Sequence, residues 1–177
     1  MQDSRGNETA KEALVKRIRA GACAGMRLGA VDLAGCDLRG VDLSHARLPG
    51  AILTGANLSG ANLYGALLDG ADLREANLTR ANLEFAVLGA ADLSKADLSG
   101  ANLQRTNLVG TRAHGARFDG ARMFYSRPGN GDFQGASFRG AEIQRAIFRR
   151  ANLAHADLRD AKGQANFENA NLEGAQQ

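Results

Sequence analysis

The chain has 177 residues, a formal net charge of +3 and only two cysteines, Cys23 and Cys36. This length suits one domain, and no apolar run approaches the roughly 18 residues of a membrane helix. The opening MQDSRGNETAKEAL lacks the apolar core of a secretory signal, and two cysteines are too few for a disulfide scaffold. These features exclude membrane-spanning and disulfide-rich classes and predict a cytoplasmic protein.

Residues 10–20 are predicted to form a short helix. Thr9 followed by Glu12 has the spacing of a capping box, and Gly21 is a typical helix stop. The first unit, 1–25, is therefore expected to contain an N-terminal tail and a helix that covers the open end of the following core, as terminal caps of repeat proteins do.

A five-residue repeat follows this segment. From Leu28 to Leu108 a leucine recurs at every fifth position, a small residue stands two positions before most of them, and glycine often stands two positions after. A period of five is neither the 3.6 of an amphipathic helix nor the 2 of a strand. A chain that turns once per repeat, with one large and one small side chain inward, is predicted to wind into a solenoid.

The repeats ANLSG, ADLSG, ANLYG and VDLSH resemble those of the pentapeptide-repeat proteins, and the resemblance covers residues 26–174. It implies an all-β solenoid: a right-handed quadrilateral β-helix with four repeats per coil and about seven coils. At the spacing of paired strands the rod would be roughly 35 Å long. Residues 175–177 are expected to form a C-terminal tail.

The pattern departs from this rule at two places. Pro128 occupies a leucine position within SRPGNGDF, and this cluster of turn formers predicts a small loop that leaves the solenoid and rejoins it in phase at Phe133. In AKGQANFENANLEG one residue is missing before Phe167, which predicts a fraying final coil. Two hypotheses remain open for this uncapped end: an end-to-end homodimer and a disordered tail.

Outward-facing residues can be sorted into four faces, because positions 20 apart lie one above another in such a coil. The four aromatic residues at outward positions all fall on one face, together with three arginines. Aromatic residues edged with arginine are typical of protein-binding surfaces, although isolated exposed aromatics are ordinary. The candidate protein-binding face comprises Tyr64, Phe85, Arg105, Arg122, Phe124, Tyr125 and Arg145.

Four consecutive repeats replace the usual Asp or Asn before the central residue with arginine: Arg112, Arg117, Arg122 and Arg127. Being five apart, they lie one per face and cannot form one flat footprint for nucleic acid, so nucleic-acid binding is unlikely to be their role. We expect solvated charges, some of which reach Asp92, Asp132 or Glu142 one coil away.

No catalytic pattern emerges from the sequence. His45, His114 and His155 fall at different columns or heights, without a paired carboxylate or the spacing of a zinc site. The serines have no base beside them, and a filled core offers no obvious pocket. We therefore expect no enzymatic activity, no metal and no cofactor.

The sequence favours a scaffold or adaptor that binds another protein through a rigid rod. The resemblance implies an alternative, because some pentapeptide-repeat proteins imitate DNA, bind DNA gyrase or other type II topoisomerases and protect against quinolones. Imitating phosphates requires an acidic surface, whereas the isoelectric point here is near 9.2. The ending NLEGAQQ also supplies no C-terminal dimerisation helix, while the expected loop at Pro128 would favour the alternative.

Overall fold

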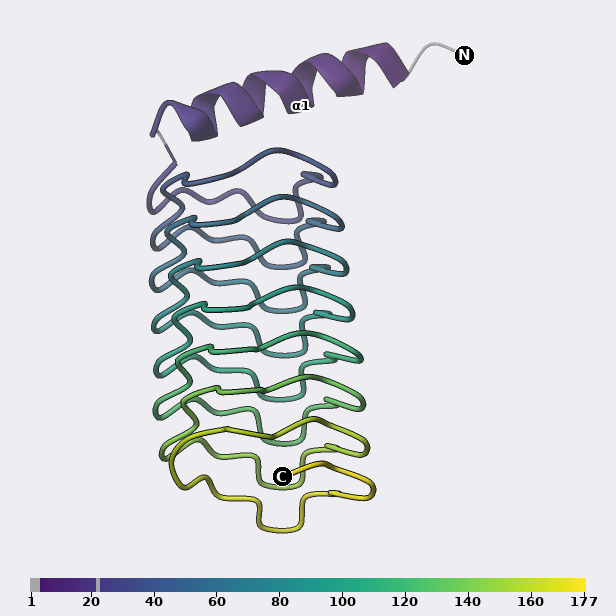
Figure 1. The fold of residues 1–177 in the computed structure, drawn as a ribbon. Helices are drawn as coiled ribbons and strands as arrows, with labels where there is room; N and C mark the ends of the chain where they lie inside the picture. Colours follow the sequence, from purple (N-terminus) through teal and green to yellow (C-terminus); the bar gives the residue numbers. More distant parts are fainter. Residues whose placement is uncertain (1–3, 22) are drawn as a thin grey trace.

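The computed structural model describes residues 4–21 and 23–177 (Figure 1). One helix, α1 (Ser4–Arg19), lies across the end of a long stack of similar coils. The chain descends this stack coil by coil, and its C-terminus lies at the opposite end from α1. The N-terminal tail expected before the helix includes residues 1–3, which lie outside the described residues.

Each coil pairs with the next through parallel bridges at a spacing of 20 residues, from Arg27↔Arg47 to Glu142↔Lys162. The Leu53 N–H donates to the Asp72 carbonyl (2.7 Å), and the Asp72 N–H donates to the Ala51 carbonyl (2.9 Å). Since only the residue before each central residue is bridged, the solenoid contains isolated bridges rather than long strands. Four repeats complete one coil.

The four faces are named in chain order by the repeats that they contain. Face 1 contains the repeat around Leu48, face 2 that around Leu53, face 3 that around Leu58 and face 4 that around Leu63. Each face continues at intervals of 20 residues along the rod. Face 4 is followed in the chain by face 1, so these two faces share an edge.

The composition of the repeat follows from its hydrogen bonds. In the repeat around Leu58, Ala56 and Leu58 are both fully buried, and the Asn57 carboxamide oxygen accepts the Ser59 N–H at 3.1 Å. The next turn closes when the Ala61 N–H donates to the Leu58 carbonyl at 3.0 Å. Asp or Asn therefore precedes the leucine because its side chain caps the N–H that follows, as in an Asx turn.

Phenylalanine replaces leucine in the core of the later coils. Four rings are fully buried: Phe118, Phe133, Phe138 and Phe148. The rings of Phe118 and Phe138, one coil apart on the same face, stack at 4.8 Å with an interplanar angle of 6°. Phe133 and Phe148 meet Phe138 at 5.8 and 5.5 Å. These distances are those of favourable aromatic pairs, so the rings fill the interior continuously.

The expected loop around Pro128 is wrong. Pro128 is buried at the central position, and the turn after it is regular, with Asn130 adopting φ of 54° where other repeats use glycine. The segment has five residues between central positions, so none is spare for a loop. A proline ring fits the core position, and its cost is local: it has no N–H to donate to the next coil.

Ser126 is fully buried, and its hydroxyl is without a hydrogen-bond partner in the structure. Ser126→Ala should raise the free energy of unfolding by about 1 kcal/mol, because an unsatisfied buried hydroxyl is costly. Thr106 is the matched control, since its hydroxyl donates to the Leu83 carbonyl at 2.7 Å. Thr106→Val should instead lower stability in the same urea titration. A lower stability for Ser126→Ala would contradict this reading.

The helix begins earlier than predicted. It starts at Ser4 rather than Ala10, so Thr9 lies inside it and the capping box is wrong. Ser4–Glu8 contains no proline, and nothing in it forbids helical hydrogen bonding upstream of Thr9. Gly21 does adopt a left-handed φ of 77° after the helix, as a helix stop requires. Within the described residues, no helix has the length and apolar character required to cross a membrane.

α1 contacts the first coils through its apolar side. Ile18 is fully buried, and Leu14 and Val15 pack against the core. Its last turn carries Lys16, Arg17 and Arg19, which suits the negative end of the helix dipole.

The one-residue deletion near the C-terminus is present, but the final coil does not fray. The register shortens to 19 residues, as in Ile147↔Asn166 and Asp157↔Gln176. Pairing continues to the Leu158 N–H, which donates to the Gln176 carbonyl at 2.7 Å. A shorter repeat thus closes its turn without breaking the backbone ladder.

Candidate protein-docking face

The structure brings all seven residues of the candidate protein-binding face together on face 4. Phe85, Phe124 and Tyr125 are 41%, 36% and 37% exposed. This exposure is unusual for large aromatic side chains, which normally seek burial. The docking face, as used below, consists of Tyr64, Phe85, Arg105, Arg122, Phe124, Tyr125 and Arg145.

Rings and guanidinium groups alternate along this face. Tyr64 and Phe85 pack edge to face with centroids 5.6 Å apart. The Arg105 guanidinium then lies 5.3 Å from the Phe85 ring and 5.9 Å from the Tyr125 ring. Arg145 lies 5.2 Å from the Tyr125 ring and donates to its hydroxyl. Such cation–π contacts hold long side chains in place, so the docking face is ordered over several coils.

His45 extends this arrangement and was missed by the sequence analysis. Its ring packs edge to face with Tyr64 at 5.3 Å. Its position 20 residues before Gly65 and 40 before Phe85 could have placed it on this face. Gly65 leaves the required space, since a Cβ there would lie 2.7 Å from His45 Nδ1.

Backbone strain is concentrated on face 4. The second residue after each central residue adopts a left-handed φ, for which glycine is the unstrained choice. Non-glycine residues fill five of six such positions on face 4, three of six on face 1, three of seven on face 2 and two of seven on face 3. The five on face 4 are His45, Phe85, Arg105, Tyr125 and Arg145. Large side chains are therefore held on face 4 at a conformational cost, which points to a functional surface.

An amide ladder beside the aromatic residues fixes the backbone of face 4. Asn62 donates to Asp42 at 3.0 Å, Asn82 to Asn62 at 3.1 Å, and Asn102 to Asn82 at 3.1 Å. Each of these side chains also accepts the N–H two residues later, as Asn62 does from Tyr64 at 3.3 Å. The ladder orients the turns from which the docking side chains project.

Arg122 continues the column of this ladder. With its amide oxygen turned toward the guanidinium, Gln104 accepts from Arg122 Nε at 3.3 Å. Arg122 does not pair with Glu142 among the residues that the structure describes, whereas Arg112 reaches Asp92 at 3.2 Å as expected. Asp132 pairs instead with His114. The four consecutive arginines therefore differ: some are neutralised by neighbours and others remain available.

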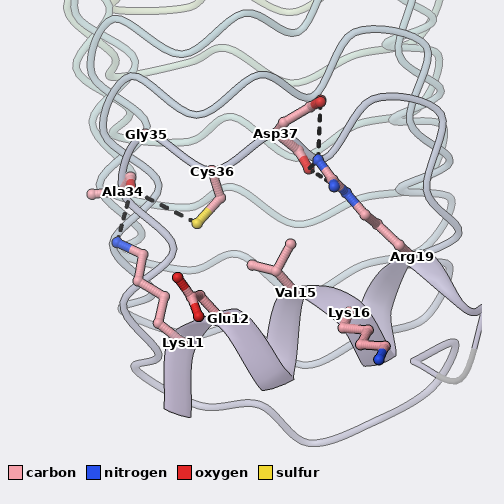
Figure 2. A pocket seen from close by; sticks show the side chains of 9 residues that line it. All are labelled: Lys11, Glu12, Val15, Lys16, Arg19, Ala34, Gly35, Cys36 and Asp37. Carbon is pink, nitrogen blue, oxygen red and sulfur yellow. Dashed lines mark hydrogen bonds and ion pairs between the residues drawn. The ribbon is translucent and has the colours of Figure 1, made fainter. Parts of the chain in front are cut away.

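A second candidate is the cavity between α1 and the second coil, about 540 Å³ in volume (Figure 2). Two basic residues of α1 bridge it: Lys11 donates to the Ala34 carbonyl at 2.8 Å, and Arg19 donates to the Asp37 carbonyl at 2.7 Å. Hydrogen bonds from Arg39 and the charges of Arg39 and Arg19 hold the pKa of Asp37 well below its usual range. These contacts attach α1 to the solenoid.

Cys36 is the one nucleophile lining this cavity (Figure 2). Burial raises the pKa of its thiol, so the reactive thiolate is disfavoured. Its Sγ lies 3.8 Å from the Ala34 carbonyl oxygen, and no histidine lines the cavity. The cavity thus lacks the base that nucleophilic catalysis requires, and the docking face is the stronger candidate site.

The described residues contain no group of three or more His, Cys, Asp and Glu side chains arranged to hold a metal ion. The three histidines lie apart, with His45 against Tyr64 and His114 against Asp132. His155 is exposed beside Gly174, where an added Cβ would meet its ring.

Comparison with known families decides the classification. The family model of pentapeptide repeats matches this chain in eight copies, over residues 23–55, 56–94, 86–123 and 132–162. The chain belongs to the pentapeptide-repeat family. No match was found among curated proteins.

Several solved pentapeptide-repeat structures are similar to the chain. A thylakoid-lumen protein of Arabidopsis thaliana is 30% identical over 75% of this chain and 72% of its own, with a TM-score of 0.39. HetL, involved in heterocyst differentiation regulation in Nostoc sp. strain PCC 7120, is 30% identical, covering 92% and 94%, with a TM-score of 0.27. QnrB1, a plasmid-mediated fluoroquinolone resistance protein, is 21% identical, covering 85% and 92%, with a TM-score of 0.48.

This pentapeptide-repeat chain departs from the family repeat where its candidate surfaces lie. The matched segments leave out residues 124–131, which include Phe124, Tyr125, Arg127 and Pro128. The departures concern outward positions and one central position, while the backbone register continues through them.

Proposed function

We propose that this chain is a non-enzymatic, cytoplasmic scaffold that binds another protein through the docking face on face 4. In this proposal the solenoid is a right-handed quadrilateral β-helix of about seven coils, and α1 is its N-terminal cap. The observation that carries the proposal is the filling of strained, left-handed positions on face 4 by Phe85, Arg105, Tyr125 and Arg145. Aromatic and arginine side chains dominate binding energy at protein interfaces.

The ordering of these side chains supports the same conclusion. Arg105 lies between two rings, so its guanidinium is held before a partner arrives. Ordering in advance lowers the entropy lost on binding. The ring faces are partly covered by arginine, which favours a protein surface over stacked nucleotide bases, since those need open rings.

Phe85→Ala combined with Tyr125→Ala should weaken partner binding at least tenfold, because both anchors of the docking face are removed. A partner is first captured with the wild-type chain and then titrated against each purified variant. Ile52→Ala on face 2 is the control, because Ile52 is equally exposed at 42%. Equal affinities of the double variant and the wild-type chain would exclude face 4 as the docking surface.

Topoisomerase binding gains no support from the surface. The Pro128 segment stays in register and does not project, and the exposed arginines do not imitate phosphates. Inhibition of gyrase supercoiling by micromolar protein would nevertheless restore that role to first place.

Self-association through the C-terminal end remains a second part of the partner proposal. A hollow of about 250 Å³ there is lined by residues that include Ile143, Leu158 and Phe167. It arises because Gly163 stands where a large central residue is usual. A second copy would cover these apolar groups, and sedimentation equilibrium distinguishes one chain from two.

A further inference from the structure

A shallow hollow of about 230 Å³ lies on face 1, around the edge from the docking face. It spans three coils and is lined chiefly by Val109, Arg127, Gly129, Ile147, Arg149 and Arg150. Val109 and Ile147 are 37% and 41% exposed. The hollow therefore combines an apolar surface with three guanidinium groups.

The backbone of this hollow offers an uncapped N–H. In the preceding coil of face 1, Asn107 accepts the Val109 N–H at 3.1 Å, and on face 2 Asp92 accepts the Ser94 N–H at 3.0 Å. Arg127 occupies the equivalent place before Pro128 and has no oxygen to offer. Within the described chain, the Gly129 N–H consequently has no side-chain acceptor. The place that a carboxylate or carboxamide oxygen takes elsewhere is open beside Arg127.

The arginines of this hollow are also less neutralised than their counterparts on faces 2 and 3. Arg112 pairs with Asp92 at 3.2 Å, and Arg117 pairs with Asp119 at 3.2 Å. On face 3, Arg139 and Arg159 share Asp157, at 3.8 and 2.6 Å.

In the hollow only Arg149 has such a partner, Glu168 at 3.3 Å. Across residues 10–21 and 23–177, Arg127 and Arg150 have no carboxylate within 4.0 Å. Two guanidinium groups and one N–H are thus free to bind the same anion.

We propose that this hollow binds a carboxylate side chain of an acidic peptide segment, carried by the partner that the scaffold docks. The inference rests on the proposed function and adds the chemistry of the partner. The carboxylate accepts hydrogen bonds from the Gly129 N–H and from Arg127 or Arg150, and arginine binds carboxylates in a paired geometry. An aliphatic residue beside the acid covers Val109 and Ile147.

Two observations favour a peptide carboxylate over a free phosphate. The rod already places its own carboxylates at equivalent turns, where Asp92 accepts from the Ser94 N–H. The apolar flanks, Val109 and Ile147, gain nothing from phosphate, whereas an aliphatic side chain buries them. Arg127 follows Tyr125 by two residues, so one extended partner can contact this hollow and the docking face together.

The test is a nuclear magnetic resonance titration of the full, ¹⁵N-labelled chain with the peptide acetyl-Ile-Asp-Leu-Glu-amide. The matched peptide acetyl-Ile-Asn-Leu-Gln-amide and inorganic phosphate are titrated separately. Saturable shifts of the Gly129 amide are expected with the acidic peptide, with at least tenfold weaker binding of the other two. Equal binding of the amide peptide, tighter binding of phosphate, or no shift at Gly129 would overturn the proposal.

Arg127→Asp provides a variant that should still fold. Its carboxylate can cap the Gly129 N–H as Asp92 caps Ser94, so thermal stability should be kept while the acidic peptide no longer binds. Arg112→Asn on face 2 is the control and should leave peptide affinity unchanged. Undiminished peptide binding by a folded Arg127→Asp variant would contradict the proposed site.

The peptide titration is independent of the docking face. Phe85→Ala with Tyr125→Ala should abolish binding of the whole partner and leave the Gly129 shifts intact. Failure of the peptide to bind, with partner binding still lost in that double variant, refutes the carboxylate site alone. Retained partner binding in the double variant, with peptide shifts intact, refutes face 4 as the docking surface instead.

Discussion

Phe138→Ala will lower the free energy of unfolding by about 3–5 kcal/mol, the range for removing a buried phenylalanine. The Phe138 ring stacks on Phe118 at 4.8 Å and meets Phe133 and Phe148 at 5.8 and 5.5 Å. Its loss leaves a cavity that the surrounding coils cannot fill, since their backbones are tied to one another. Urea unfolding followed by circular dichroism measures the change.

Phe124→Ala is the matched control, because Phe124 is the same residue type at 36% exposure. Its removal should change stability by no more than about 0.5 kcal/mol, as is usual for surface substitutions. A loss below about 1 kcal/mol for Phe138→Ala would mean that the rings do not form a continuous core.

Gly131→Ala will destabilise the rod by about 1–3 kcal/mol, although alanine is the usual residue at this place in the repeat. A Cβ on Gly131 would lie 2.6 Å from Phe133 Cε2 and 3.0 Å from the Thr111 carbonyl oxygen. Most glycine-to-alanine changes at compatible positions stabilise by about 0.4–1 kcal/mol through the unfolded chain. Here the clash with a buried ring outweighs that gain.

Two further variants separate the clash from other effects. Gly89→Ala should be neutral or stabilising, because its added Cβ meets chiefly a flexible Asp69 oxygen at 3.2 Å. Adding Phe133→Leu to Gly131→Ala should recover part of the loss, which a double-mutant cycle quantifies. A stabilising effect of Gly131→Ala in the wild-type background would refute the proposed crowding.

The regular part of the fold was predictable because the repeat is explicit in the residues. Leucine and alanine at fixed places specify what is buried, and each repeat supplies its own turn. The two errors arose where a local signal was trusted above this register. Pro128 suggested a loop, yet five residues per repeat left no spare length. Thr9 suggested a helix start, yet the upstream residues also permit a helix.

The composition of the docking face was also predictable, because a register of 20 residues sorts outward positions into columns. Tyr64, Phe85 and Tyr125 fall on one face by that arithmetic alone. Their contacts were not predictable, since they depend on side-chain rotamers. The alternation of Arg105 between two rings and the packing of His45 on Tyr64 therefore emerged only from the structure.

The hollow on face 1 was missed for a different reason. Its guanidinium groups come from different repeats, and their significance lies in what other faces have and this one lacks. Arginines on faces 2 and 3 are paired with aspartates, which the sequence shows only as similar numbers of charges. The role of Asp and Asn as caps, once visible in the hydrogen bonds, identifies Arg127 as an exception.

The central claim is that the rod presents its binding chemistry on faces 4 and 1 and leaves faces 2 and 3 inert. One coil tests this directly, because Gln104, Val109, His114 and Asp119 occupy equivalent outward positions on faces 4, 1, 2 and 3. A photoreactive phenylalanine is placed at each position in turn, and cells that make the protein are irradiated. The same partner should crosslink from positions 104 and 109 and not from 114 and 119; equal crosslinking from all four, or crosslinking only from 114 and 119, would contradict the account.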